Sequence, residues 1–314
     1  MLQPAQTAFL FPGQGSQKLG MGRDLVEAYP VARQTFEQAD WRLGFSLSHL
    51  AWEGPEEELN DTLNTQPALL VHSVAALRVF MERYPDFRPA FVAGHSMGEL
   101  SALVAASALE FKETLALVRR RGELMKEAGD ISPGGMAAIL GLDIPTVLDI
   151  CARATLGDEV VQVANDNCPG QVVISGASQA LQRAIQLAQE AGARRVRPLA
   201  ISIAAHSPLM ARSQSKFSQA VVAASIVDPL IPLIGNVTAL PLTTAPEIRA
   251  DLRAQLTSPV RWTESIQGMV QRGVMTFIEI GSGDVLSGLV KRIAPDTQRI
   301  SIGTVADFDK LDNL

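Results

Sequence analysis

The sequence predicts an α/β protein in which a parallel sheet covered by helices carries a small inserted subdomain. Apolar segments typical of buried strands alternate with helical segments over most of the chain, as in parallel sheets with helices on both faces. Between residues 134 and 202 the order becomes strand, helix, strand, strand, helix, strand, which is typical of a ferredoxin-like unit. We therefore expect a large unit at 1–132 and 203–314, a ferredoxin-like subdomain at 133–202, and a cleft between them.

The expected elements of the large unit follow from short apolar runs and from the helical spacing of apolar residues. Before the insertion they are a strand at 7–11, a glycine-rich turn at 12–15, a helix from about residue 21, a helix at 67–83, a strand at 90–93 and a buried helix at 97–109. After residue 206 they are a helix, a strand at 230–236, a helix from about residue 263, a strand at 276–280, a turn at 281–283 and a last helix. Residues 307–314 are expected to form a short polar tail.

The elements of the inserted unit are predicted from the same two signals. Its strands are expected at 135–142, 159–164, 171–175 and 195–201, and its helices at 144–154 and 178–191. No internal repeat or low-complexity segment interrupts this order.

Size and composition are those of an ordinary globular protein. The chain has 314 residues, of which 47% are hydrophobic, 5% aromatic and 19% charged. A net charge of −6, with no basic run longer than Arg119-Arg120-Arg121, argues against a nucleic-acid partner. The two cysteines, Cys151 and Cys168, have neither zinc-site nor disulfide spacing and suit a reducing compartment.

The N-terminus and the hydropathy pattern predict a cytoplasmic protein. Residues 1–11 have no basic residue before their apolar stretch and run into Pro12-Gly13, so they indicate a first strand and not a signal peptide. No run approaches the roughly 20 apolar residues that a membrane-spanning helix needs. We therefore expect no membrane association.

The segment Gly94-His95-Ser96-Met97-Gly98 matches the G-x-S-x-G pattern of a nucleophile elbow. In such a turn a strand leads into a helix, the serine is exposed at the corner, and the flanking glycines make room for it. The helix expected after Ser96 directs N–H groups and the positive end of its dipole towards any oxyanion formed there. A glycine-flanked serine is also often a helix cap, but the strand before it and the buried helix after it favour a nucleophile.

A serine nucleophile needs a base, and histidine is the usual one near neutral pH. The chain has four histidines: His49, His72, His95 and His206. The first two lie in a polar segment and on an apolar helix, and His95 is interpreted as a packed residue of the elbow. His206 follows an expected strand and precedes Ser207-Pro208, a helix-start signal, and active-site histidines favour such loops. His206 is therefore the predicted base.

Arg121 is predicted to be a buried cation. Its helix carries an apolar stripe formed by Leu117, Val118, Leu124 and Met125, and at about 100° per residue Arg121 falls in the middle of that stripe. A buried guanidinium requires an anion. Two interpretations stay open: a salt bridge to a core Asp or Glu, or a bidentate contact with the carboxylate of a substrate.

The turn Gly13-Gln14-Gly15 does not complete a dinucleotide-binding motif, because Lys18 occupies the third glycine position. No phosphate-binding Gly-Lys-Ser/Thr sequence is present either. The glycines are expected to let the backbone approach the active site closely, and Gln14 is a candidate second donor to the oxyanion. We expect neither a bound cofactor nor a metal.

Four segments, in order along nearly the whole chain, resemble those of the malonyl-CoA:acyl carrier protein transacylases. They are Phe11 to Gln17 (FPGQGSQ), Gly94 to Glu99 (GHSMGE), Asn167 to Gly176 (NCPGQVVISG) and Ser258 to Trp262 (SPVRW). The resemblance implies an α/β-hydrolase-like core with a ferredoxin-like subdomain. It also implies a ping-pong transfer of a malonyl group from malonyl-CoA to the phosphopantetheine thiol of an acyl carrier protein, in fatty-acid or polyketide synthesis.

The resemblance further implies roles for individual residues. They are an acylated nucleophile at Ser96, its base at His206, a ligand for the malonyl carboxylate at Arg121, oxyanion-hole N–H groups at Gln14 and Met97, and a backbone carbonyl at Gln255 that orients the histidine in place of an aspartate. An acidic carrier protein needs a local basic patch on this acidic chain. The candidates for that patch are Arg194, Arg195, Lys291 and Arg292.

Two positions depart from the pattern of this family. The family often has proline where Ser282 stands, which is expected to change only the stiffness of the loop. Ala205, directly before the predicted base, is small, so it stays open whether a methylmalonyl group is excluded. The apolar Met97 favours malonyl. Three alternatives also stay open: an acyltransferase with a different or broader acyl preference, a serine hydrolase of acyl thioesters, and a non-catalytic acyl-binding module.

Overall fold

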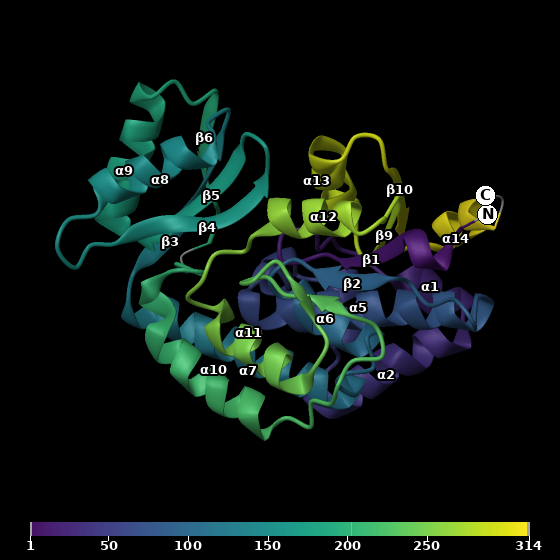
Figure 1. Cartoon of the computed structure of the whole chain (residues 1–314). Helices are drawn as coiled ribbons and strands as arrows, with labels where there is room; N and C mark the ends of the chain where they lie inside the picture. The colour runs from purple at the N-terminus through teal and green to yellow at the C-terminus, as the bar shows by residue number, and fades with distance from the viewer. Residues whose placement is uncertain (1, 202, 313–314) are drawn as a thin grey trace.

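A six-stranded sheet forms the core of the larger part of the molecule (Figure 1). In this computed structural model, which describes residues 2–201 and 203–312, the strand order is β10-β9-β1-β2-β7-β8. The strands are β1 (Thr7–Phe11), β2 (Phe91–Gly94), β7 (Leu233–Ile234), β8 (Pro241–Leu242), β9 (Thr276–Ile280) and β10 (Gln298–Ile302). All pairs are parallel except β7 with β8. The predicted parallel α/β core is confirmed.

Alternate residues of the central strand β1 face two separate hydrophobic cores. Phe9 and Phe11 belong to the larger cluster, whereas Ala8 and Leu10 belong to a second cluster that includes Trp262. This division follows from the two-residue repeat of a β-strand. Apolar residues at four successive positions, 8–11, are expected where both faces of a parallel sheet are covered.

Helices supply that cover on both sides of the sheet, with α12 and α13 on one side and α5 and α6 on the other in Figure 1. The helices of this part are α1 (Arg23–Ala28), α2 (Pro30–Leu43), α3 (Leu47–Glu53), α4 (Glu56–Asn60), α5 (Thr62–Arg83), α6 (Gly98–Ala105), α7 (Phe111–Ile131), α10 (Ala211–Ala223), α11 (Ala245–Gln255), α12 (Trp262–Gln271), α13 (Val285–Ile293) and α14 (Val305–Leu311). Within the described residues, none of the helices has both the length and the apolar character needed to cross a bilayer.

The second sheet has four strands in the order β4-β5-β3-β6, all paired antiparallel. Its elements are β3 (Gly134–Leu140), α8 (Ile144–Ala154), β4 (Val161–Cys168), β5 (Gln171–Ala177), α9 (Ser178–Glu190) and β6 (Arg195–Pro198), which is the predicted ferredoxin-like order. Ile139 and Ile174 face the core shared with α8 and α9, while Met136 and Val173 join the core of the larger part. We propose residues 133–202 as the bounds of this subdomain and the rest of the chain as the large unit.

The helix expected at 67–83 begins earlier, at Thr62, and Pro67 lies inside it. Proline has no N–H to donate to the carbonyl of Leu63, one helical turn before it. Arg119 of α7 occupies this acceptor instead, with 3.2 Å between its Nη1 and the Leu63 carbonyl oxygen. A contact from a distant segment therefore satisfies the carbonyl that the proline leaves without its helical donor.

The prediction of a polar tail at 307–314 is wrong for the residues that the structure describes. Residues Val305–Leu311 form α14, which begins with a capping box at Thr304. Phe308 and Leu311 lie one turn apart and are both buried. Residues 313 and 314 lie outside the described residues.

Two expected strands are shorter than predicted. The strand expected at 230–236 is reduced to β7, and the one expected at 195–201 ends with β6. Pro232 and Pro198 lie at these limits, and proline cannot donate to a β-ladder. No element was expected from the sequence at the positions of α2, α3, α4, β8, α11 or β10.

β1, β2 and α6 meet at the elbow with no space for additional side chains. A Cβ on Gly94 would lie 2.0 Å from the carbonyl carbon of Gly98, and a Cβ on Gly98 would lie 2.1 Å from the carbonyl oxygen of Phe11. These neighbours are backbone atoms of packed elements, which cannot easily move aside. The glycines of the elbow motif therefore let α6 begin directly against the ends of both strands.

Gly98→Ala is expected to lower the free energy of unfolding by roughly 2–3 kcal/mol, because the new methyl group overlaps the backbone of β1. Gly288→Ala is the matched control, since a Cβ at this exposed position of α13 meets nothing within 4 Å. That control is expected to stabilise the protein by about 0.5–1 kcal/mol. Urea denaturation of both variants measures the difference, and a Gly98→Ala protein as stable as the control would contradict the close packing.

Candidate active site

Ser96 stands at the corner between β2 and α6, where the elbow motif predicts it. Its φ angle of 52° lies in the left-handed region, a conformation that costs a non-glycine residue about 1–3 kcal/mol and is typical of functional sites. Its Oγ lies 2.8 Å from Nε2 of His206 and 3.0 Å from Nη2 of Arg121. The structure thus brings together three predicted site residues that lie far apart in the sequence.

His206 lies in the loop before a short 3₁₀ helix, Pro208–Met210, which Ser207 caps as predicted. Its Nδ1 donates to the carbonyl oxygens of Gln255, at 2.9 Å, and Ser258, at 3.1 Å. With the proton held on Nδ1, the lone pair of Nε2 faces the Oγ of Ser96. Burial and then the nearby charge of Arg121 lower the pKa of His206 to about 3. The imidazole is therefore neutral at neutral pH and able to accept a proton from the serine.

The other three histidines take no part in this contact. His49 is exposed, and Nε2 of His72 lies 2.8 Å from the carbonyl oxygen of Gly303. His95 packs against Trp262, and its Nε2 lies 2.8 Å from Oδ1 of Asn167, so it is a packed residue of the elbow. Among the described residues, no group of His, Cys, Asp or Glu side chains is arranged to hold a metal ion.

Arg121 is buried, with 1% of its surface exposed, and the described residues give it no carboxylate in ion-pair contact. Its Nη1 donates to Oε1 of Gln66 at 2.9 Å, and its Nη2 donates to Oε1 of Gln255 at 2.9 Å. Burial lowers the pKa of Arg121 to about 10, so the guanidinium remains charged at neutral pH. The described part of the chain therefore offers no salt bridge to this residue, and the charge has no anion in direct contact.

Gln255 has a second function that the sequence analysis missed. Besides the backbone carbonyl that faces His206, its fully buried side chain connects three other residues. Oε1 accepts from Arg121, while Nε2 donates to the carbonyl oxygen of Ser96 at 3.2 Å and to Oε2 of Glu99 at 2.6 Å. One residue at the end of α11 thus fixes the base, the elbow and the guanidinium relative to one another.

Asn236 is a further residue that the sequence analysis did not select. It follows β7, is 2% exposed, and accepts through Oδ1 from the N–H of Ser96 at 2.7 Å. Its Nδ2 donates to the carbonyl oxygen of Gly94 at 2.7 Å. Both bonds hold the left-handed elbow in place. The signal was present, because the carboxyl ends of neighbouring parallel strands meet at one edge of a sheet, and β7 lies beside β2.

A cavity of about 110 Å³ adjoins Ser96. Its apolar lining is Met97, Met125, Met136, Leu199, Ile201, Ile203 and Ala205, and its polar lining is Gln14, Thr62, His95, Ser96, Arg121, Asn165 and His206. The side chain of Gln14 donates to Oγ1 of Thr62 at 3.1 Å. Gln14 and Met97 both line the cavity that holds Ser96, and the use of their backbone N–H groups as an oxyanion hole stays a prediction.

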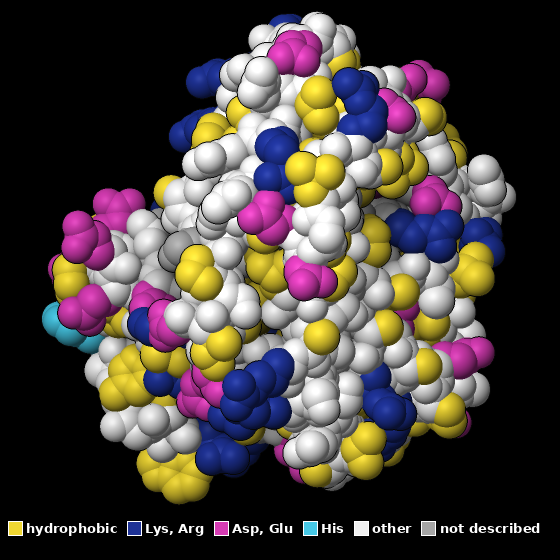
Figure 2. All heavy atoms as spheres, turned by 90° about the vertical axis from the view of Figure 1, so that its left-hand side faces the viewer, with side chains coloured by type: hydrophobic (Ala, Val, Ile, Leu, Met, Phe, Trp, Pro, Cys, Tyr) yellow, Lys and Arg dark blue, Asp and Glu magenta, His cyan; other side chains and the backbone are white. Residues whose placement is uncertain are grey.

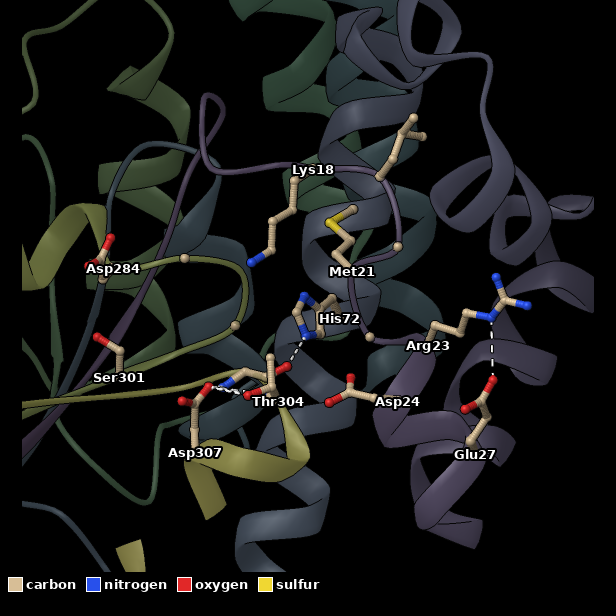
Figure 3. Close-up of a pocket in the computed structure, with 16 residues that line it drawn as sticks. Lys18, Met21, Arg23, Asp24, Glu27, His72, Asp284, Ser301, Thr304 and Asp307 are labelled. Atoms are coloured by element: carbon tan, nitrogen blue, oxygen red, sulfur yellow. Dashed lines mark hydrogen bonds and ion pairs between the residues drawn. The ribbon is translucent and has the colours of Figure 1, made fainter. Parts of the chain in front are cut away.

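A larger cavity of about 780 Å³ lies near the ends of β1, β9 and β10 (Figure 3). Lys18 points into it, and the ring of His72 lies at its base. This cavity shares no lining residue with the one at Ser96. Size alone therefore does not mark the reactive centre, because the smaller cavity holds the nucleophile, the base and the unpaired cation.

The chain is similar to proteins of one kind over nearly its whole length. The family model described as an acyl transferase domain matches residues 8–306. The malonyl CoA-acyl carrier protein transacylase of Haemophilus influenzae is 47% identical over 97% of each chain. An acyl carrier protein S-malonyltransferase structure from Vibrio cholerae is 43% identical, with a TM-score of 0.94 over 98% of this chain and 100% of that one. A malonyl-transacylase solved in complex with a type II PKS acyl-carrier protein is 42% identical, with a TM-score of 0.94 over 99% and 100% of the two chains.

Asn236→Ala is expected to slow the reaction of Ser96 with a fluorophosphonate serine probe by about tenfold to a hundredfold, because the elbow loses both bonds that hold it. The labelling rate at Ser96, followed by mass spectrometry, measures the effect without any assumption about the natural substrate. A melting temperature shows whether the fold survives. Labelling as fast as in the wild type would contradict the positioning role of Asn236.

Proposed function

The chain belongs to the acyl transferase family, and we propose that it transfers a malonyl group from malonyl-CoA to the phosphopantetheine thiol of an acyl carrier protein. The observation that carries this proposal is the buried charge of Arg121, which has no carboxylate partner among the described residues and donates to Oγ of Ser96 at 3.0 Å. A malonyl thioester has its free carboxylate two bonds from the reacting carbonyl carbon. It therefore delivers an anion to Arg121 when its carbonyl reaches Ser96.

The first half-reaction forms a malonyl ester on Ser96. Nε2 of His206 takes the serine proton while Oγ attacks the thioester carbonyl, and the N–H groups of Gln14 and Met97 stabilise the oxyanion. When the carbon–sulfur bond breaks, the imidazolium gives its proton to the departing CoA thiolate. The carbonyl oxygens of Gln255 and Ser258 hold Nδ1–H throughout, in the place that an aspartate takes in other serine enzymes.

The second half-reaction runs the same steps in reverse with a different thiol. The phosphopantetheine thiol of the carrier protein gives its proton to His206 and attacks the ester carbonyl of malonyl-Ser96. The ester bond breaks, and the serine oxygen recovers its proton from the imidazolium. One base therefore serves both steps of a ping-pong reaction, and the chemistry requires only malonyl-CoA and the carrier-bound phosphopantetheine, with no resident cofactor.

Arg121 and His206 are also linked through charge. After burial, the positive charge of Arg121 is the second cause that lowers the pKa of His206 to about 3. When a malonyl carboxylate pairs with Arg121, that charge is neutralised and the pKa of His206 rises. The correct substrate therefore strengthens the base that activates Ser96. Acetyl-CoA has no carboxylate and leaves the base weak.

The size and lining of the cavity support a small acyl group. Its volume of about 110 Å³ and its methionine side chains fit a three-carbon unit. Ala205 leaves space beside the base, which keeps methylmalonyl-CoA among the substrates to be assayed. A serine hydrolase uses the same nucleophile and base, so the fate of the acyl group distinguishes it from a transferase.

The carrier protein is expected to dock on basic residues near the cleft. Figure 2 shows Lys and Arg side chains in several separate groups among acidic ones on the face that it presents. Arg292 already binds Oε1 of Gln171 and the carbonyl oxygen of Pro169. Arg194, Arg195 and Lys291 are therefore the better candidates for contact with an acidic carrier.

We place this reaction in the cytoplasm, in the supply of malonyl units for fatty-acid or polyketide synthesis. The proposal is supported by Cys151 and Cys168, which are both buried free thiols and suit a reducing compartment.

Incubation with malonyl-CoA is expected to add one malonyl group at Ser96, seen by mass spectrometry of the peptide. Addition of phosphopantetheinylated carrier protein is expected to remove that group and produce malonyl-carrier. Ser96→Ala abolishes the adduct, and a carrier protein without phosphopantetheine is the matched control that accepts nothing. Release of malonate to water with no malonyl-carrier would favour the hydrolase alternative.

Arg121→Ala is expected to lower kcat/KM for malonyl-CoA by about a hundredfold or more, because the substrate anion loses a charge-assisted pair in a partly dry site. Acetyl-CoA never forms that pair, so its kcat/KM is expected to be maintained or to rise as the pKa of His206 recovers. Arg120→Ala is the control on the same helix, since Arg120 is half-exposed and pairs with Glu123. An equal loss for both substrates together with a lower melting temperature would make Arg121 a structural residue.

A further inference from the structure

Glu99 is a buried carboxyl group that the mechanism above does not use. It lies in the first turn of α6, and none of its surface is exposed. Its Oε2 accepts a hydrogen bond from Nε2 of Gln255 at 2.6 Å, and Oε1 of that same amide accepts from Arg121 at 2.9 Å. One amide group therefore separates Glu99 from the guanidinium. An ionised Glu99 would offset the charge that the malonyl carboxylate is to bind.

Asp251 faces Glu99 from α11 and is also buried. The two carboxyl groups influence each other: beyond the effect of burial, Asp251 raises the pKa of Glu99, whereas Glu99 lowers the pKa of Asp251, as expected when Glu99 donates a hydrogen bond to Asp251. A carboxylate oxygen only accepts hydrogen bonds, so two carboxyl groups bond directly only when one of them carries a proton. The other groups that face Glu99 are the amide of Gln255 and the N–H of Asn236, with Arg121 beyond the amide.

The geometry points to Glu99 as the carboxyl that carries the proton. Asp251 accepts from the N–H groups of Val237 and Thr238 and from Oγ1 of Thr238, at distances of 3.2 to 3.3 Å, and such donors favour the ionised form. Oε1 of Glu99 accepts no hydrogen bond from the described residues, as expected of an oxygen that itself donates. Burial raises the pKa of both groups, and raises that of Glu99 well above its usual range.

We propose that Glu99 is a neutral positioning residue, which holds its proton against Asp251 so that Arg121 keeps its charge for the carboxylate of the substrate. The neutral carboxyl still accepts from Gln255, so the amide is fixed without an adjacent negative charge. The negative charge then resides on Asp251, which is not among the groups that shift the pKa of Arg121. The consequence for substrate choice rests on the proposed function, whereas the protonation of Glu99 does not.

The protonation is tested in the free protein, with no substrate present. Infrared difference spectra between the wild type and Glu99→Gln, at about pH 8 where an ordinary Glu is ionised, are expected to show the C=O stretch of a protonated carboxyl that the variant lacks. Glutamine has the same shape and can donate to Asp251, so the fold is expected to survive. A difference spectrum without that band overturns the proposal, whatever the activity.

The consequence for substrate choice is tested with Asp251→Asn. Its amide offers Glu99 a donor, so Glu99 ionises and kcat/KM for malonyl-CoA relative to acetyl-CoA is expected to fall by about tenfold. In the double variant E99Q/D251N no charge forms at position 99, and the ratio is expected to recover towards the wild-type value. An unchanged ratio in D251N, or no recovery in the double variant, overturns the role of the proton. A wild-type protein that transfers no acyl group contradicts the proposed function and leaves the infrared result standing.

Discussion

The rest of the active site depends on one constraint, which is a guanidinium buried without a protein anion. Moving such a charge out of water costs several kcal/mol, and the fold offsets that cost with the neutral amide oxygens of Gln66 and Gln255. Amide oxygens solvate a cation but do not neutralise it. Burial and then this remaining charge keep His206 in its neutral form, and the guanidinium donates to Oγ of Ser96. The nucleophile, the base and the supporting amides are thus arranged around a positive charge. Only an anionic ligand neutralises that charge.

Features that depend on neighbouring residues could be predicted from the sequence. The elbow at Ser96 is one strand, one turn and one helix, and the place of Arg121 on an apolar stripe follows from the helical repeat alone. The hydrogen bonds of Asn236 to the elbow and the side-chain contacts of Gln255 could not be predicted from neighbouring residues. Their partner, Ser96, lies 140 and 159 residues away in the sequence. The start of α5 was misjudged for the same reason, since Arg119 compensates for the proline.

The ferredoxin-like subdomain supplies part of the cavity wall, whereas the nucleophile, its base and the cation belong to the large unit. Met136 of β3, Asn165 of β4 and Leu199 after β6 line the space beside Ser96. The order of helices and strands in the subdomain was predictable, because six short segments in a fixed order are recognisable even when their ends are not. The two-residue repeat of the β-strand decides which face of the subdomain sheet packs against the large unit. Alternate side chains of β3 enter different cores.

Both reacting residues, Ser96 and His206, have left-handed backbones, with φ angles of 52° and 58°. Glycine adopts this conformation without steric cost, so the sequence that is best for folding at these two positions differs from the one that is best for chemistry. The site thus holds a local trade-off between stability and activity. Selection for heat resistance alone favours glycine at both positions and yields a sturdier but inert scaffold. Thermostable versions of this catalyst must therefore obtain their stability elsewhere in the fold.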